Sequence, residues 1–176
     1  MSKPVVLFDI DGCLNIIMGV LPGHPAPNRP FLITEVQVPK TVGVFRTHVA
    51  FETIRQVNQL LPDITPFWFT SWFQDAPAFG KAIRLPEFPV LGSFEDLEGI
   101  PGDEEGNPEQ WWKLQVLEKL FLTEPLVWVD DEFQTFPNDV QNWLKTRTAP
   151  TCLVPCNPRE GLDAQELEEA LITVSQ

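Results

Sequence analysis

Four short, almost wholly apolar runs constrain the fold of this 176-residue chain most strongly. They are VVLF at residues 5–8, PFWF at 66–69, LVWV at 126–129 and TCLV at 151–154. Such runs, bounded by polar residues, are typical of strands in a parallel sheet that is covered on both faces. No apolar run approaches the roughly 20 residues needed to span a bilayer, so we expect no membrane segment.

Segments with helical spacing or helix-start signals alternate with these runs. The expected helices cover residues 49–61, 75–83, 108–121, 139–145 and 163–174, with Asp163 as the N-cap of the last one. This alternation predicts an α/β fold of three layers, Rossmann-like, with a mainly parallel sheet and helices on both faces. The length suits one domain, residues 1–176.

An insertion separates the first strand from the first helix. Residues 14–29 are rich in Gly and Pro and predict a loop, while residues 31–38 and 42–47 flank Pro39-Lys40-Thr41 and predict a β-hairpin. Residues 14–48 therefore form a loop-and-hairpin insertion, which is too small for a helical bundle. The later polar segment from Ser93 to Asn107 is shorter still.

Charge and cysteine content narrow the function classes. The 25 acids against 12 bases give a formal net charge of −13, which disfavours tight independent binding to a nucleic-acid backbone. It leaves open a site in which a metal ion neutralises phosphate. Cys13, Cys152 and Cys156 are a poor disulfide set, and we expect them to pack as small apolar residues rather than to form a redox or metal pair. With no secretory signal pattern at the N-terminus, we expect a cytoplasmic protein.

Polar side chains follow three of the four apolar runs. The residues are Asp9 and Asp11, Thr70 and Ser71, and Asp130 and Asp131. Because ligands bind at the carboxyl ends of parallel strands, these side chains would meet in one crevice if the strands are neighbours. The carboxylates would repel one another, and Mg²⁺ with a substrate phosphate would relieve that repulsion. A single Asp-x-Asp is a weak signal, since an Asx-turn that ends a strand gives the same pattern.

The ordered set is more specific than any one motif. VVLFDIDGCLN, FWFTSW, Lys113 in WWKLQVLEKL, and LVWVDDE resemble, in that order, the four motifs of the haloacid-dehalogenase (HAD) superfamily. The resemblance covers nearly the whole chain. The DIDGCLN and WVDDE segments also resemble a subgroup of small bacterial and phage HAD domains, some of them joined to RNA-repair modules.

The resemblance implies roles for these residues. Asp9 would be the nucleophile that forms an aspartyl-phosphate, and Asp11 the general acid and base, both on one side of a strand. Thr70 and Lys113 would hold the phosphoryl oxygens; with Ser71 (the alternative to Thr70) and Gly12 they form the implied substrate-binding set. The magnesium ion would be held by Asp9, the backbone carbonyl of Asp11, Asp130, and Asp131 directly or through water.

Several of these residues have alternative assignments, some of them purely structural. Lys81, Lys119 and Lys145 rival Lys113, and Asp131 could be an N-cap or a supporting acid. Most of the tryptophans are expected in the core or in the walls of the site, with base stacking as a lesser possibility for one of them. His24 and His48 lie outside the motifs.

The predicted activity is a Mg²⁺-dependent phosphatase. Asp11 favours phosphoryl transfer, because dehalogenases of this fold lack the second acid. Response-regulator receiver domains place their paired acids early and their Lys last, which is a different order. An open site would admit a phosphorylated small molecule, a nucleotide or a nucleic-acid end. The alternative is a binding or scaffold protein that retains the fold.

Overall fold

The core of the protein is a four-stranded parallel sheet. The computed structural model describes residues 3–17, 21–23, 25–38, 43–93, 95, 111–118, 120 and 123–176. The strands are β1 (Val5–Phe8), β4 (Thr65–Trp68), β5 (Leu126–Asp130) and β6 (Thr151–Pro155), in the order β4-β1-β5-β6. Every residue of β1 and β5 is buried, which agrees with continuous apolar runs at the centre of a covered sheet.

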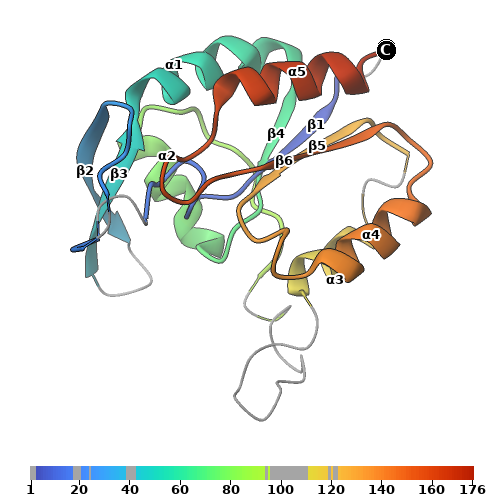
Figure 1. Cartoon of the computed structure of the whole chain (residues 1–176), viewed down its shortest axis with the longest axis horizontal. Helices are drawn as coiled ribbons and strands as arrows, with labels where there is room; N and C mark the ends of the chain where they lie inside the picture. The colour runs from blue at the N-terminus through green and yellow to red at the C-terminus, as the bar shows by residue number, and fades with distance from the viewer. Residues whose placement is uncertain are drawn as a thin grey trace.

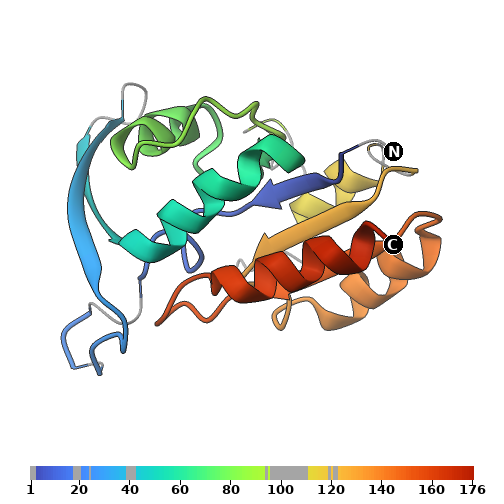
Figure 2. The same ribbon diagram turned by 90° about the horizontal axis from the view of Figure 1, so that it is seen from above.

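Helices cover both faces of this sheet (Figures 1 and 2). One face carries α1 (Phe51–Leu60) and α5 (Ala164–Val174), and the other carries α3 (Trp112–Leu117) and α4 (Pro137–Thr146). Alternate residues of each central strand therefore enter different cores: Phe8 packs in the first and Leu7 in the second. The predicted α/β fold with helices on both faces is confirmed.

A β-hairpin forms a second, two-stranded sheet. Its strands β2 (Phe31–Val38) and β3 (Gly43–Ala50) pair antiparallel, as predicted. The prediction that a helix begins at Val49 is wrong. Val49 and Ala50 pair with Leu32 and Phe31 across the hairpin, so the ladder continues until the helical pattern begins at Phe51.

The remaining elements differ from the predictions mainly at their ends. Helix α2 (Ala76–Ala82) packs with the core of α1 and α5 and follows a 3₁₀ turn at Phe73–Asp75, while a second such turn, Leu61–Asp63, follows α1. The predicted start of α3 at 108–110 and most of the segment 93–107 lie outside the described residues.

Helix ends follow ordinary capping rules. Pro137 starts α4 two residues earlier than predicted, at a position that suits a residue without an N–H. Asp163 caps α5 as expected, because its carboxylate accepts a hydrogen bond from the Gln165 N–H at 2.9 Å. Where helices are described, none combines the length and apolarity needed to cross a membrane.

Candidate functional site

The polar ends of three adjacent strands lie side by side. β1 is hydrogen-bonded to β4 on one side and to β5 on the other, so residues that follow these strands share one edge of the sheet. The Asp9 N–H donates to Val129 O at 3.1 Å, and the Phe69 N–H donates to Phe8 O at 2.8 Å. Asp9, Thr70 and Asp130 therefore lie at the ends of neighbouring strands, which is the condition that the sequence analysis set for a shared crevice.

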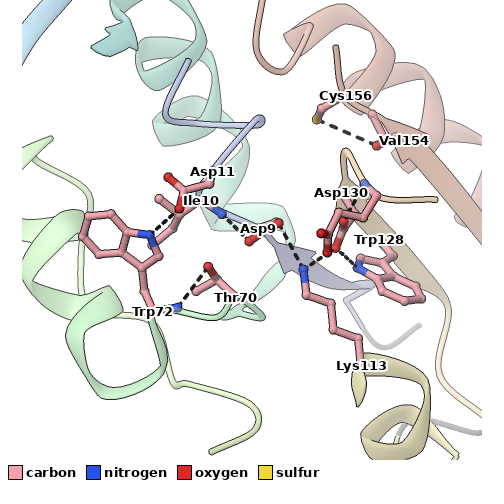
Figure 3. Close-up of polar contacts among 11 residues, drawn as sticks. Asp9, Ile10, Asp11, Thr70, Trp72, Lys113, Trp128, Asp130, Val154 and Cys156 are labelled. Carbon is pink, nitrogen blue, oxygen red and sulfur yellow. Dashed lines mark hydrogen bonds and ion pairs between the residues drawn. The ribbon is translucent and has the colours of Figure 1, made fainter. Parts of the chain in front are cut away.

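A buried lysine joins the acids of β1 and β5. Lys113, in the first turn of α3, places its Nζ 3.0 Å from Asp9 Oδ2 and 2.6 Å from Asp130 Oδ2 (Figure 3). All three side chains are buried, and that of Lys113 is only 2% exposed. One cation thus compensates two carboxylates in a site from which water is nearly excluded.

Aromatic rings surround the lysine. Its Nζ lies 5.6 to 5.9 Å from the ring centroids of Phe69, Trp111 and Trp112. Burial alone acts to lower the pKa of Lys113, but the charges of Asp130 and Asp9 outweigh it, so the pKa lies above its usual value. Lys113 is therefore protonated at neutral pH.

Asp130 is fully engaged by the protein. Besides Lys113, its Oδ2 accepts a hydrogen bond from the Trp128 indole N–H at 3.1 Å, and its Oδ1 accepts one from the Glu132 N–H at 3.0 Å. Burial raises the pKa of Asp130, while Lys113 acts in the opposite direction. These contacts make Asp130 a support for Lys113, a role that the sequence analysis did not consider.

Asp131 faces the nucleophile candidate instead. Ligand atoms of Asp9, Cys13 and Asp131 all lie within 4.8 Å of one another. Burial, followed by the charges of Asp9 and Glu132, raises the pKa of Asp131 to about 7. Two carboxylates that approach in this way fit a hard divalent cation, whose charge would favour their ionised forms.

Gly12 allows the Asp131 carboxylate to lie against the backbone that follows β1. Its φ is +72°, a left-handed conformation that glycine adopts readily, and a Cβ at this position would overlap the carboxylate of Asp131. The glycine of the DIDG segment is thus explained by the fold: it turns the chain after β1 and leaves space for the acid that follows β5.

Asp11 lies in a turn. β1 ends at Phe8, so the prediction that strand spacing places Asp9 and Asp11 on one side does not apply. The Asp11 carboxylate accepts a hydrogen bond from the Trp72 indole N–H at 2.8 Å (Figure 3). It accepts a second one from the Asn15 side-chain amide at 2.7 Å. Burial raises the pKa of Asp11, and these two hydrogen bonds act in the opposite direction.

Asn15 and Trp72 are functional candidates that sequence reasoning missed. Asn15 is buried, and its side-chain oxygen accepts from the His48 N–H at 2.9 Å, which ties Asp11 to the hairpin. Trp72 follows β4, far from Asp11 in sequence, and the sequence analysis expects it in the core or in a wall of the site, with base stacking as a lesser alternative. The one available signal was their position next to the motifs, in DGCLN and TSW.

The two hydroxyl candidates differ in burial. Thr70 is fully buried, and its hydroxyl accepts from the Trp72 N–H at 3.4 Å, whereas Ser71 is exposed. Of the rivals to Lys113, Lys81 and Lys145 are exposed on other helices.

His24 and Lys119 lie outside the described residues. Cys13 and Cys156 are buried free thiols, and burial raises the pKa of both.

Comparison of the chain with models of protein families, with curated proteins and with solved structures gives no match. The function is therefore inferred from the residues and geometry of the site.

Proposed function

We propose that the protein is a Mg²⁺-dependent phosphatase that hydrolyses a phosphomonoester through an aspartyl-phosphate on Asp9. The observation that supports this most is the contact of Lys113 with Asp9, at 3.0 Å, in a buried site. A protonated lysine beside a carboxylate at the end of a central strand can bind a phosphoryl oxygen where the carboxylate can attack phosphorus. The resemblance of the four segments to HAD motifs adds to this argument.

The first step forms a bond between an Asp9 carboxylate oxygen and phosphorus, and the bond from phosphorus to the leaving oxygen breaks. Asp11 donates a proton to that oxygen. A raised pKa suits this role, because it increases the share of Asp11 that is protonated near neutral pH. Trp72 and Asn15 hold the Asp11 carboxylate in position throughout.

The second step returns the enzyme to its starting state. A water oxygen attacks phosphorus, its proton passes to Asp11, and the bond to Asp9 breaks to release inorganic phosphate. Lys113 and Thr70 contact the phosphoryl oxygens in both steps. Asp130 keeps Lys113 oriented and charged.

Asp9 and Asp131 would hold the magnesium ion, with the Asp11 backbone carbonyl as a further ligand. When bound, Mg²⁺ supplies charge neutralisation for the carboxylates and for the substrate phosphate. Asp130 contributes to the site through Lys113, whose Nζ donates to its Oδ2 at 2.6 Å.

The direct test is hydrolysis of p-nitrophenyl phosphate with and without Mg²⁺. We expect activity from the unmodified protein with Mg²⁺, and a loss of at least about 10³-fold in Asp9→Asn, because the nucleophile is removed. Asp63→Asn is the matched control, since it removes one exposed carboxylate that precedes β4, at the opposite end of that strand from Thr70. If the unmodified protein binds Mg²⁺ and is as inert as Asp9→Asn, the phosphatase proposal fails and a binding or scaffold role is favoured.

A further inference from the structure

A pocket of about 330 Å³ opens between the hairpin and the ends of β1 and β4. Its lining includes Asp11, Ser71 and Trp72 from the sheet edge and Phe45, Arg46 and Thr47 from β3. This volume lies at the lower end of the range for small-molecule sites. The pocket adjoins the proposed acid and is separate from the contact of Lys113 with Asp9.

The position of Asp11 says which part of a substrate would occupy this pocket. A general acid must lie within hydrogen-bond reach of the leaving oxygen. In the proposed reaction, the group that departs with that oxygen therefore lies on the Asp11 side. The pocket lined by Asp11 is the space available to it.

Two aromatic rings line this space. The rings of Phe45 and Trp72 are 5.6 Å apart at an interplanar angle of 54°, so they form a corner rather than a closed stack. Phe45 is 46% exposed, so its ring is open to a ligand. The Trp72 indole is fixed by its hydrogen bond to Asp11, so one wall of the corner is rigid.

We infer that this pocket binds a leaving group that contains a planar aromatic ring, as in a nucleoside 5′-monophosphate, with the ring against Phe45 and Trp72. The inference rests on the proposed phosphatase function and specifies its substrate class.

Charge in the pocket favours a neutral ring. Two carboxylates, Asp11 and Asp75, line it together with one guanidinium, that of Arg46. Arg46 makes only a loose contact with Glu35, at 3.9 Å between exposed side chains, so its donors remain accessible to acceptor atoms on a ring. A second phosphate on the leaving group would meet both carboxylates.

The experiment compares two substrates, one with an aromatic base and one without it. Uridine 5′-monophosphate and ribose 5-phosphate share the phosphate and the sugar, so the ratio of their kcat/KM values isolates the base. Stacking of a base on an aromatic side chain predicts a preference of roughly 5- to 150-fold for the nucleotide. Phe45→Ala should remove most of that preference, because it should lower kcat/KM for the nucleotide more than for ribose 5-phosphate. Val44→Ala, at a neighbouring exposed position of β3, is the matched control.

Binding gives a second readout that does not need turnover. Calorimetry on Asp9→Asn with Mg²⁺ should show tighter binding of uridine 5′-monophosphate than of ribose 5-phosphate, and Phe45→Ala in that background should abolish the difference. Equal kcat/KM for the two substrates, or a preference that survives Phe45→Ala, overturns the inference while the phosphatase function stands. If neither these substrates nor p-nitrophenyl phosphate is hydrolysed, the phosphatase function fails and the inference fails with it.

Discussion

Replacing Lys113 with methionine should destabilise the protein strongly. The substitution keeps most of the side-chain volume and removes the charge, so two buried carboxylates, Asp9 and Asp130, lose a cation at 3.0 and 2.6 Å. Breaking a buried ion pair by removing one partner costs about 3–5 kcal/mol, since the remaining charge is uncompensated. For a domain of this length each kcal/mol lowers Tm by about 2–4 °C, so we expect a decrease of roughly 6–20 °C.

The pH dependence of the stability loss distinguishes the effect of the missing charge from that of a packing defect. Burial raises the folded-state pKa of Asp130 above that of the unfolded chain, and removing Lys113 takes away the charge that acts in the opposite direction. The folded variant therefore binds protons as the pH falls, and this stabilises it relative to the unfolded state. The loss in free energy of unfolding caused by Lys113→Met should be smaller at pH 5 than at pH 8. A pure packing defect would be the same at both values.

The assay is urea unfolding at the two pH values without divalent cations, with thermal melting alongside. Lys81→Met is the matched control, because Lys81 is exposed on α2, and it should change the free energy of unfolding by no more than about 0.5 kcal/mol. The double variant Lys113→Met/Asp130→Asn should recover part of the loss, since one uncompensated charge is removed. A deficit below about 1 kcal/mol, or one that does not depend on pH, would refute the reasoning.

Four other perturbations test separate contacts. Gly12→Ala should displace Asp131 and abolish Mg²⁺ binding measured by calorimetry; unchanged affinity would contradict the close approach. Because Mg²⁺ binds the ionised carboxylate and the pKa of Asp131 is raised to about 7, Mg²⁺ affinity should rise from pH 6 to pH 8, and a flat profile would count against this site. Trp72→Phe removes a hydrogen bond that lowers the pKa of Asp11. With an alkyl phosphate as substrate, the alkaline limb of the pH–rate profile should therefore move to higher pH. An unmoved limb would exclude Asp11 as the general acid. Cd²⁺ should give a thiolate charge-transfer band in the ultraviolet that Cys13→Ser abolishes while Mg²⁺ binding persists; a band that survives would place the thiolate elsewhere.

The strands were predictable because their signal is local. The residues of VVLF at 5–8 and LVWV at 126–129 are all buried in the central strands, and the acids that follow them meet at one edge of the sheet. The boundary at Val49 was not predictable from periodicity. Val49 is β-branched and directly precedes a helical pattern, so its position suits the end of a strand as well as the start of a helix. Only its pairing with Leu32 shows that it belongs to the strand.

The partners of the acids depend on long-range packing. The resemblance implied both Asp130 and Asp131 as metal ligands and did not distinguish their protein partners. In the structure Asp130 contacts Lys113 and Trp128, while Asp131 approaches Asp9. Two adjacent acids in a sequence do not reveal which of them will contact a lysine on a helix that covers one face of the sheet. The contact between Asp11 and Trp72 joins residues 61 positions apart and was likewise invisible in the sequence.

The central claim, an aspartyl-phosphate on Asp9, is tested most directly by the pre-steady state of Asp11→Asn with p-nitrophenyl phosphate and Mg²⁺. Nitrophenolate leaves without a proton, so the first step proceeds, whereas attack by water needs the missing base. The account predicts a rapid burst of about one nitrophenolate per protein molecule, then a slow phase, and no burst when Asp9→Asn is added. Acid quenching during the slow phase should locate the phosphoryl group on Asp9 by peptide mass spectrometry. A linear time course without a burst, or a burst that persists in the double variant, would contradict the account.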